Sequence, residues 1–281
     1  MIEQTKKIVF GIVTYKEFFW ETITFQTLVN SLREYNCLNN IIIYIVDNTD
    51  SEGWAVTFPK EYKDLVIYKN LPNPGISVAY NKIQEYAFEE KIEWIVLLDQ
   101  DTTLPLDCIG VYMRAIDNKE TMIKAPIIHT ERGLLSPLKY KYYRSHSFFH
   151  IKEGVISIDN ISCINTGLMI NTCFFQKVGG YNKKLKLDFC DHDFIERAKQ
   201  LTKKLQILGI HLFQDFSSIT HTKEQAIERY KRFILDFYVF GENRNKFFLL
   251  FYVDLPRVIK QTFKYKTLDF IKIRIKYLFK K

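Results

Sequence analysis

The sequence has no long apolar run and few cysteines. Its longest uninterrupted apolar stretch is Phe247–Val253, far shorter than the ~20 residues that span a bilayer. Five cysteines are scattered through 281 residues without a Cys-x-x-Cys spacing, which argues against a disulfide framework or a zinc site. The first residues, MIEQTKK, lack the apolar core and cleavage site of a signal peptide. These absences favour a cytoplasmic protein with reduced thiols.

Two phosphate-binding motifs are also missing near the N-terminus. The segment GIVTYKEFFW at 11–20 contains one glycine and Lys16 as its only cation. A dinucleotide oxidoreductase would carry Gly-x-Gly-x-x-Gly there, and a nucleotidyltransferase would be expected to carry a glycine-rich and basic loop. No internal repeat or Gly/Ser linker divides the chain, and a hydrophobic content of 47% is ample for one large core or two small ones.

Short apolar runs alternate with helical patterns through the first hundred residues. Between two of these runs, Phe25, Leu28, Val29 and Leu32 recur at helical spacing. This alternation predicts an α/β fold with a mostly parallel central sheet and helices on both faces. The strands are expected at 7–15, 41–46, 65–68 and 94–98.

Two carboxylates follow the last of these strands. Asp99 and Asp101 stand directly after Trp94–Leu98, at the edge of the sheet where open α/β folds bind ligands. With one residue between them on an extended backbone, both side chains can point to the same side. Two neighbouring anions of this kind suit Mg²⁺ or Mn²⁺ shared with substrate phosphates. The alternative is a solvated pair that caps the next helix.

Seven motifs in order resemble family 2 glycosyltransferases of the GT-A fold. They are VTYK at 13–16, IVDNTDS at 45–51, NPGISVAYN at 73–81, LLDQDT at 97–102, NTGLMIN at 165–171, VGGYN at 178–182 and LDFCDHDFIERA at 187–198. The spelling of the fourth and seventh motifs is most similar to the bacterial rhamnosyltransferase branch. The resemblance covers roughly residues 7–250. It implies a GT-A domain at 1–254, with a donor-binding half at 1–125 and an acceptor-binding half at 126–254.

The resemblance implies an inverting transfer of a sugar, with rhamnose the expected one, in bacterial surface polysaccharide synthesis. The donor would be a dTDP or UDP sugar and the acceptor a hydroxyl of a glycan or a polyprenyl-diphosphate-linked molecule. Asp101 would bind the metal, Asp99 would hold the ribose or share the metal, and His221 would lie near it. The remaining donor-binding residues implied are Thr14, Tyr15, Asp47, Gly75, Asn81 and Arg244. For most of these residues an ordinary turn, cap or core role stays open.

The acceptor hydroxyl must lose a proton as it attacks, so the reaction needs a base. By resemblance this base is Asp191, while Gly167 and Asp193 belong to the acceptor side. Arg197 stands four residues after Asp193, at the spacing of an ion pair within a helix. The sequence alone does not separate Asp191 from its neighbours Asp188 and Asp193, which also suit the N-terminal dipole of a helix. Phe194 replaces a frequent Trp, so the acceptor pocket can differ from that of relatives.

All excess positive charge lies at the C-terminal end. Residues 255–281 contain nine Lys or Arg and one acid, whereas residues 1–254 carry 31 of each sign. Aromatic and aliphatic residues alternate with these cations, a mixture typical of a segment on an anionic membrane surface. Leu268, Ile271, Ile275 and Leu278 fit a helix, while Ile271, Ile273, Ile275 and Tyr277 fit a strand. A solvated basic helix and a subunit contact are the alternatives, so a homo-oligomer stays open, and nucleic acid is not the expected partner.

Function classes other than a transferase also remain open at this point. A nucleotidyltransferase would use two carboxylates and a metal as well. A scaffold without catalysis would bind a partner through its aromatic and basic surface and would bind no nucleotide. Metal-dependent nucleotide binding separates these classes.

Overall fold

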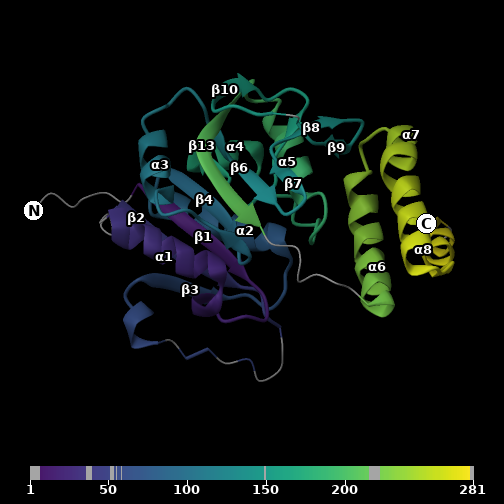
Figure 1. Ribbon diagram of the computed structural model, residues 1–281, viewed down its shortest axis with the longest axis horizontal. Helices are drawn as coiled ribbons and strands as arrows, with labels where there is room; N and C mark the ends of the chain where they lie inside the picture. The colour runs from purple at the N-terminus through teal and green to yellow at the C-terminus, as the bar shows by residue number, and fades with distance from the viewer. Residues whose placement is uncertain are drawn as a thin grey trace, which may run out of the picture.

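The computed structural model describes residues 7–35, 40–50, 54, 56–57, 59–148, 150–214 and 222–278. A twisted central sheet lies between helices, and α6, α7 and α8 form a further helical layer at the right of Figure 1. Among the described residues, no helix combines the length and apolarity that a membrane span requires.

The first half of the sheet consists of four parallel strands. They are β1 (Ile8–Thr14), β2 (Ile41–Asp47), β3 (Val66–Asn70) and β4 (Trp94–Asp99), in the order β4-β1-β2-β3. Short 3-10 helices at Phe19–Glu21 and Lys60–Tyr62 precede α1 and β3. Helices α1 (Ile23–Tyr35), α2 (Ile76–Glu89) and α3 (Cys108–Ala115) connect or follow these strands. The four predicted strands and the predicted helix between the first two are therefore confirmed.

The second half of the sheet adds mixed pairing. The order continues from β4 through β12 (Met169–Asn171), β6 (Ile123–Thr130) and β13 (Lys204–Gln214) to β10 (Gly154–Ser157), while β5 (Thr102–Thr103) pairs with β13 and β7 (Gly133–Ser136) pairs with β6. Because β12 is antiparallel to both β4 and β6, and β13 is parallel to β6, strands β4, β6 and β13 point the same way. The sheet is thus mostly parallel, as predicted. A small separate sheet contains β8 (Leu138–Lys141), β9 (Arg144–His146) and β11 (Ile161–Ser162).

Two apolar cores cover the two faces of the sheet. Along β1, Ile8, Phe10 and Ile12 belong to the core that includes α1 and α3, whereas Val9 and Val13 belong to the core that includes α2. Side chains that alternate along a strand point to opposite faces, which explains this division. Gly11 lies on the α2 face, where a Cβ would meet the side chain of Ile83 at 2.4 Å. Helix α2 can therefore approach the sheet closely at this point.

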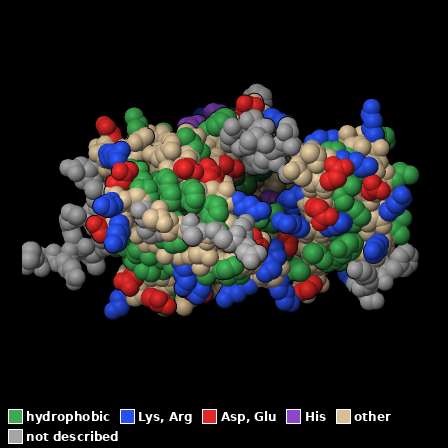
Figure 2. Space-filling model, turned by 90° about the horizontal axis from the view of Figure 1, so that it is seen from below, with side chains coloured by type: hydrophobic (Ala, Val, Ile, Leu, Met, Phe, Trp, Pro, Cys, Tyr) green, Lys and Arg blue, Asp and Glu red, His purple; other side chains and the backbone are tan. Residues whose placement is uncertain are grey.

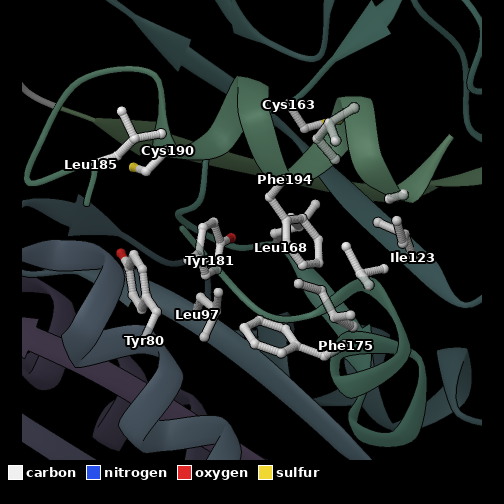
Figure 3. Close-up of a cluster of buried hydrophobic side chains, with 14 of the residues drawn as sticks. Tyr80, Leu97, Ile123, Cys163, Leu168, Phe175, Tyr181, Leu185, Cys190 and Phe194 are labelled. Carbon is white, nitrogen blue, oxygen red and sulfur yellow. The ribbon is translucent and has the colours of Figure 1, made fainter. Parts of the chain in front are cut away.

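The α2 core also fixes α4 (Thr172–Val178) and α5 (Cys190–Ala198). Phe194 of α5 packs against Phe175 and Tyr181, with ring centroids 5.1 and 4.7 Å away. Figure 3 shows this cluster, in which Tyr181 lies between Tyr80 and Phe194. The Phe194 ring therefore anchors α5 to the core that covers this face of the sheet.

The C-terminal part folds as a group of helices. It contains α6 (Lys223–Phe240), α7 (Lys246–Phe248), the π-helical turn η4 (Leu249–Asp254), α8 (Leu255–Tyr265) and α9 (Asp269–Leu278). Val258 and Phe270 are buried, and Arg274 of α9 pairs with the buried Asp254. Of the two periodicities in this segment, the helical one is realised. Residues 255–278 are therefore packed helices, while the division of the chain at 125 and 254 stays a prediction.

Candidate active site

Carboxyl ends of several strands meet at one cavity of about 690 Å³, which we call the strand-end pocket. Its lining includes Thr14, Tyr15, Gly75, Asp99 and Asp101, five of the residues named from the sequence. The parallel direction of β1, β2 and β4 brings their last residues to this edge. Lys186 and Arg232 also line it. Figure 2 shows Lys and Arg side chains gathered around a hollow near the middle of the molecule.

The two strand-end acids are held by uncharged donors. Asp99 accepts a hydrogen bond from the Tyr80 hydroxyl, and the Gln214 amide donates to Oδ1 of Asp101 over 2.9 Å. Burial raises the pKa of Asp99 to about 7, and the negative charges of Asp101 and Asp191 contribute to this rise. The three carboxylates therefore act on one another, although Asp191 comes from a different element. Tyr80 lies within the motif at 73–81 but was not singled out from the sequence, and Gln214 belongs to none of the seven motifs.

The ends of β1 and β2 contribute polar atoms that have no protein partner. Oγ1 of Thr14 and Oδ1 of Asn48 are buried without a hydrogen bond, and both residues line the strand-end pocket. The Tyr15 N–H donates to Oε1 of Gln100 over 2.6 Å. Buried polar atoms of this kind usually have partners. A bound ligand would supply them here.

Asp47 has a different environment from the one predicted. Its carboxylate accepts hydrogen bonds from the Thr49 N–H (2.9 Å), the Trp54 indole (2.8 Å) and the Tyr68 hydroxyl (2.7 Å). Burial and the contact with Asp47 raise the pKa of Tyr68. In this structure Asp47 shapes the loop after β2, and its neighbour Asn48 is the residue that lines the pocket.

Gly75 and Asn81 were predicted together but have separate roles. Gly75 precedes α2 with φ +97°, and a Cβ there would lie 2.9 Å from the backbone of Lys186, so a larger residue would be strained and crowded. The Asn81 amide donates to Tyr181 O over 2.9 Å and accepts from Tyr181 N over 2.8 Å. Both polar atoms of the Asn81 side chain therefore hold the loop before α5, and its donor-binding role stays a prediction.

The three acids near α5 differ in their partners. Asp188 forms a bidentate pair with Arg229, with Nη2 2.8 Å from Oδ1. Asp193 is paired with Arg197, as predicted, and also with Arg244, at 2.9 Å in each case. In the described part of the chain, no Lys or Arg forms an ion pair with Asp191, which accepts the His192 N–H over 2.7 Å. Asp191 is thus the acid of the three that keeps a carboxylate for another partner.

Helix α6 fixes the segment that leads to these acids. The buried carboxylate of Asp236 accepts the N–H groups of Lys186, Leu187 and Asp188 at 2.8–2.9 Å. Three backbone donors bound to one carboxylate hold this segment in a single conformation. Sequence reasoning did not identify Asp236, because it stands about fifty residues from the motif that it supports.

A second cavity of about 600 Å³ lies beside Asp191, and we call it the helix pocket. Asp188, Asp191 and His192 line one part of it, and Arg257 and Lys260 of α8 line another. Leu187 lines both this cavity and the strand-end pocket. The two pockets are therefore neighbours, with Asp191 in the lining of one and Asp101 in the lining of the other.

The three remaining predicted site residues are Gly167, Arg244 and His221. Gly167, with φ +74°, packs so closely against Pro126 and Leu212 that a Cβ would lie within about 2.6 Å of each, and its acceptor-binding role stays a prediction. Arg244 binds Asp193 and Glu196 and lies over the Phe240 ring at 3.7 Å, and its contact with a donor phosphate stays a prediction. His221 lies outside the described residues.

Sequence comparison identifies the family. Residues 10–179 match glycosyl transferase family 2, and this match covers more than half of the chain. The chain belongs to glycosyl transferase family 2. This glycosyltransferase is also 25% identical over 192 residues to the dTDP-rhamnosyl transferase RfbF of Shigella flexneri, a match that covers 66% of the chain and 61% of that relative.

Solved structures confirm the GT-A fold of this glycosyltransferase. S. aureus TarS residues 1–349 in complex with UDP superpose with a TM-score of 0.56 at 14% identity, over 83% of this chain and 65% of that one. GalNAc-T7 with UDP, GalNAc and Mn²⁺ gives a TM-score of 0.54 at 14% identity, over 83% and 47%. The chain thus spans under two thirds of each of these proteins. At these identities the likeness establishes the fold alone.

The oxygen atoms at the end of β4 fit a hard divalent cation. Among the described residues, no group of three or more His, Cys, Asp and Glu side chains forms a ready-made metal site. Asp99 and Asp101 nonetheless present two carboxylates to one pocket, and their mutual repulsion is what a cation would relieve. Magnesium in particular is often held by one or two carboxylates together with substrate phosphates. These two acids are therefore the residues of this glycosyltransferase that would hold a metal.

Proposed function

We propose that this glycosyltransferase is an inverting, metal-dependent enzyme that uses Asp191 as its base. The observation that carries the proposal is the position of Asp191, in a pocket that adjoins the one containing Asp99 and Asp101. An inverting displacement needs the acceptor hydroxyl on the side opposite the leaving diphosphate. Two adjoining pockets, one for each substrate, meet this requirement.

The strand-end pocket is the proposed donor site. A nucleoside diphosphate is the leaving group, and Mn²⁺ or Mg²⁺ at Asp99 and Asp101 would neutralise its developing charge. Thr14 and Asn48 supply unpartnered polar atoms for the nucleoside, and Lys186 and Arg232 supply positive charge. These residues bind and orient the donor, while Gly75 lets the backbone of Lys186 approach the start of α2 closely.

Asp191 is the residue proposed to take the proton. Since Asp188 and Asp193 are bound by arginines, their carboxylates are poorly suited to accept one. In this proposal Asp193 is a positioning residue, because it anchors α5 to Arg244. His192 is held by Ser162, with Nδ1 2.6 Å from Oγ, and lies next to the base on the acceptor side.

Rhamnose carried by dTDP is the proposed donor, and the RfbF relative supports it. The acceptor is proposed to be a glycan or a polyprenyl-diphosphate-linked molecule in bacterial surface polysaccharide synthesis, at the cytoplasmic face of the membrane.

A thermal-shift panel of dTDP and UDP with Mn²⁺, Mg²⁺ or EDTA tests donor and metal together. We expect a nucleotide to raise the melting temperature of the protein only when a metal is present. A larger increase with dTDP than with UDP supports rhamnose as the sugar. No nucleotide response would favour the scaffold without catalysis, and nucleotide-sugar synthesis from a nucleoside triphosphate would favour the nucleotidyltransferase.

We propose further that the C-terminal helices hold the enzyme on an anionic membrane surface. Phe247, Phe251, Leu255, Ile259 and Phe263 follow one another at intervals of four residues along α7, η4 and α8, and all are exposed, Phe263 by 77%. We call them the apolar row. In a regular α-helix, residues four apart are rotated about the helix axis by roughly 40° from one to the next. The wider π turn of η4 rotates them in the opposite sense, so the row stays on one side.

Positive charge accompanies the apolar row. Lys260, Lys264 and Lys266 are exposed on or next to α8. The right-hand end of Figure 2, where α6 and α8 lie, shows hydrophobic side chains among Lys and Arg. Each cation near an anionic surface contributes about 1 kcal/mol of binding, and apolar side chains add to this when they enter the interface. We expect this contact to be made by the folded surface of α7, η4 and α8. Point variants of the row therefore test it better than a deletion, which would uncover the face of α6 that packs against α9.

A further inference from the structure

The helix pocket contains more positive than negative charge. Arg144 of β9 and Arg257 and Lys260 of α8 line it together with Asp188 and Asp191. Asp188 is already neutralised by Arg229. Within the described residues, no carboxylate forms an ion pair with Arg144, Arg257 or Lys260. Three cations therefore surround a cavity whose remaining carboxylate is Asp191.

Arg257 is the most constrained of these cations. Its guanidinium lies over the Phe233 ring at 3.7 Å, and its Nε is buried without a hydrogen bond. Burial lowers the pKa of Arg257, although the charge of Asp188 partly offsets this effect. An arginine fixed by stacking loses little conformational freedom when it binds an anion. Arg257 is therefore a preorganised donor, and no acid in the described part of the chain forms an ion pair with it.

We propose that the helix pocket binds an anionic group of the acceptor, a phosphate or diphosphate, next to the hydroxyl that Asp191 deprotonates. Three cations suit a group with more than one negative charge better than a single carboxylate, and arginine matches the geometry of phosphate oxygens. The volume of about 600 Å³ leaves room for a sugar beside the anion. This inference rests on the proposed function, because it assigns the pocket to the acceptor.

The position of α8 joins this site to the apolar row. Arg257 and Lys260 line the pocket, while Leu255, Ile259 and Phe263 of the same helix are exposed on the surface. A phosphate at the pocket would thus stand within one helix width of the proposed membrane contact. A lipid-linked phosphate and a phosphate within a glycan share the chemistry that these cations recognise.

Direct binding of inorganic pyrophosphate and of farnesyl diphosphate tests the site. Isothermal titration in EDTA removes metal-dependent binding at Asp99 and Asp101. The variants are Arg257→Gln and the pair Arg144→Gln with Lys260→Gln, the latter two at exposed positions where loss of the fold is not expected. The matched control is Lys276→Gln, which removes one exposed charge of α9 that does not line the pocket.

We expect both probes to bind the unchanged protein, and about tenfold or more weaker binding in the pocket variants. The control should stay within about twofold. Tighter binding of farnesyl diphosphate than of pyrophosphate identifies a lipid-linked acceptor, and equal binding identifies a phosphate recognised without its lipid. No binding by the unchanged protein, or an equal loss in Lys276→Gln, overturns the proposal. Nucleotide binding with Mn²⁺, measured on the same samples, reports on the transferase proposal separately.

Discussion

The acids at the end of β4 and the acids near α5 are stabilised in opposite ways. Asp99 and Asp101 receive hydrogen bonds from Tyr80 and Gln214, which are uncharged. Asp188 and Asp193, in contrast, are bound by arginines. The Tyr80 hydroxyl does not neutralise the charge of Asp99, and burial raises the pKa of this carboxyl to about 7. An arginine neutralises the charge of the carboxylate that it binds.

This contrast separates carboxylates that can react from carboxylates that hold the fold. A metal ion or a proton can be attracted only to a charge that the protein has not already neutralised. Among the described residues, Asp191 shares with Asp99 the lack of an ion pair with Lys or Arg, although it stands between two paired acids in the sequence. The following predictions test that division, first on the reactive side and then on the structural one.

The largest effect is expected for Asp101→Ala. Without this carboxylate the metal loses one of its two proposed ligands, and the leaving diphosphate is no longer neutralised. Sugar transfer should fall by a factor on the order of 10⁴ or more. Steady-state kinetics measure the loss, and Asp107→Ala, at another acid of the same segment outside the pocket lining, serves as control. Full activity with unchanged Mn²⁺ dependence would remove Asp101 from the metal site.

Asp191→Asn should abolish the proton acceptor while keeping the shape of the side chain. We expect transfer to fall on the order of 10² to 10⁴-fold with little change in donor affinity. Asp188→Asn and Asp193→Asn are the comparison, because both leave an arginine without its acid. Those two should lower stability more than they lower kcat. A similar loss of donor binding in Asp191→Asn would show a structural role instead.

On the structural side, Arg274→Met should leave Asp254 as a buried charge without its partner. Loss of one member of a buried pair costs about 3–5 kcal/mol of unfolding free energy. Burial already raises the pKa of Asp254, and Arg274 counteracts this rise. The variant should therefore raise that pKa further, so the folded state binds a proton more readily than the unfolded one and stability falls as pH rises.

Denaturant unfolding at pH 5 and pH 8 measures this difference. The deficit of Arg274→Met should be smaller at pH 5, where Asp254 can take a proton. Lys272→Met is the matched control, because its ion pair with Asp269 lies on the surface of the same helix and should contribute little. An equal deficit at both pH values would show that packing of the arginine, and not its charge, holds α9.

The smallest effect is expected for the membrane contact. Phe251→Ser, Ile259→Ser and Phe263→Ser should each weaken binding to anionic vesicles by about tenfold, since a buried apolar side chain contributes about 1.5–3 kcal/mol. The fold should survive, because all three side chains are exposed. Co-sedimentation at low and high salt measures binding, with Leu201→Ser as an exposed apolar control outside the row. Unchanged binding, or no preference for anionic lipid, would favour subunit packing.

The strands and the position of the strand-end acids could be predicted because their signal is local. A buried parallel strand reads as a continuous apolar run, and Trp94–Leu98 with Asp99 behind it needs no distant residue to be recognised. The turn at Gly75 could be predicted in the same way, since the residues that form it are neighbours in the sequence. The packing of Gly167 and Asn81 could not be predicted, because Pro126 and Tyr181, which surround them, come from other parts of the chain.

The sequence by itself determined the α/β fold, the family and the edge of the sheet at which Asp99 and Asp101 lie. Only the tertiary structure distinguished Asp191 from Asp188 and Asp193. Arg229, which binds Asp188, stands 41 residues further along on α6, and Arg244, which binds Asp193 in addition to the nearby Arg197, stands 51 residues further along after α6. Periodicity and motif spacing report on contacts within one element, whereas the charge left on a carboxylate depends on every element packed around it.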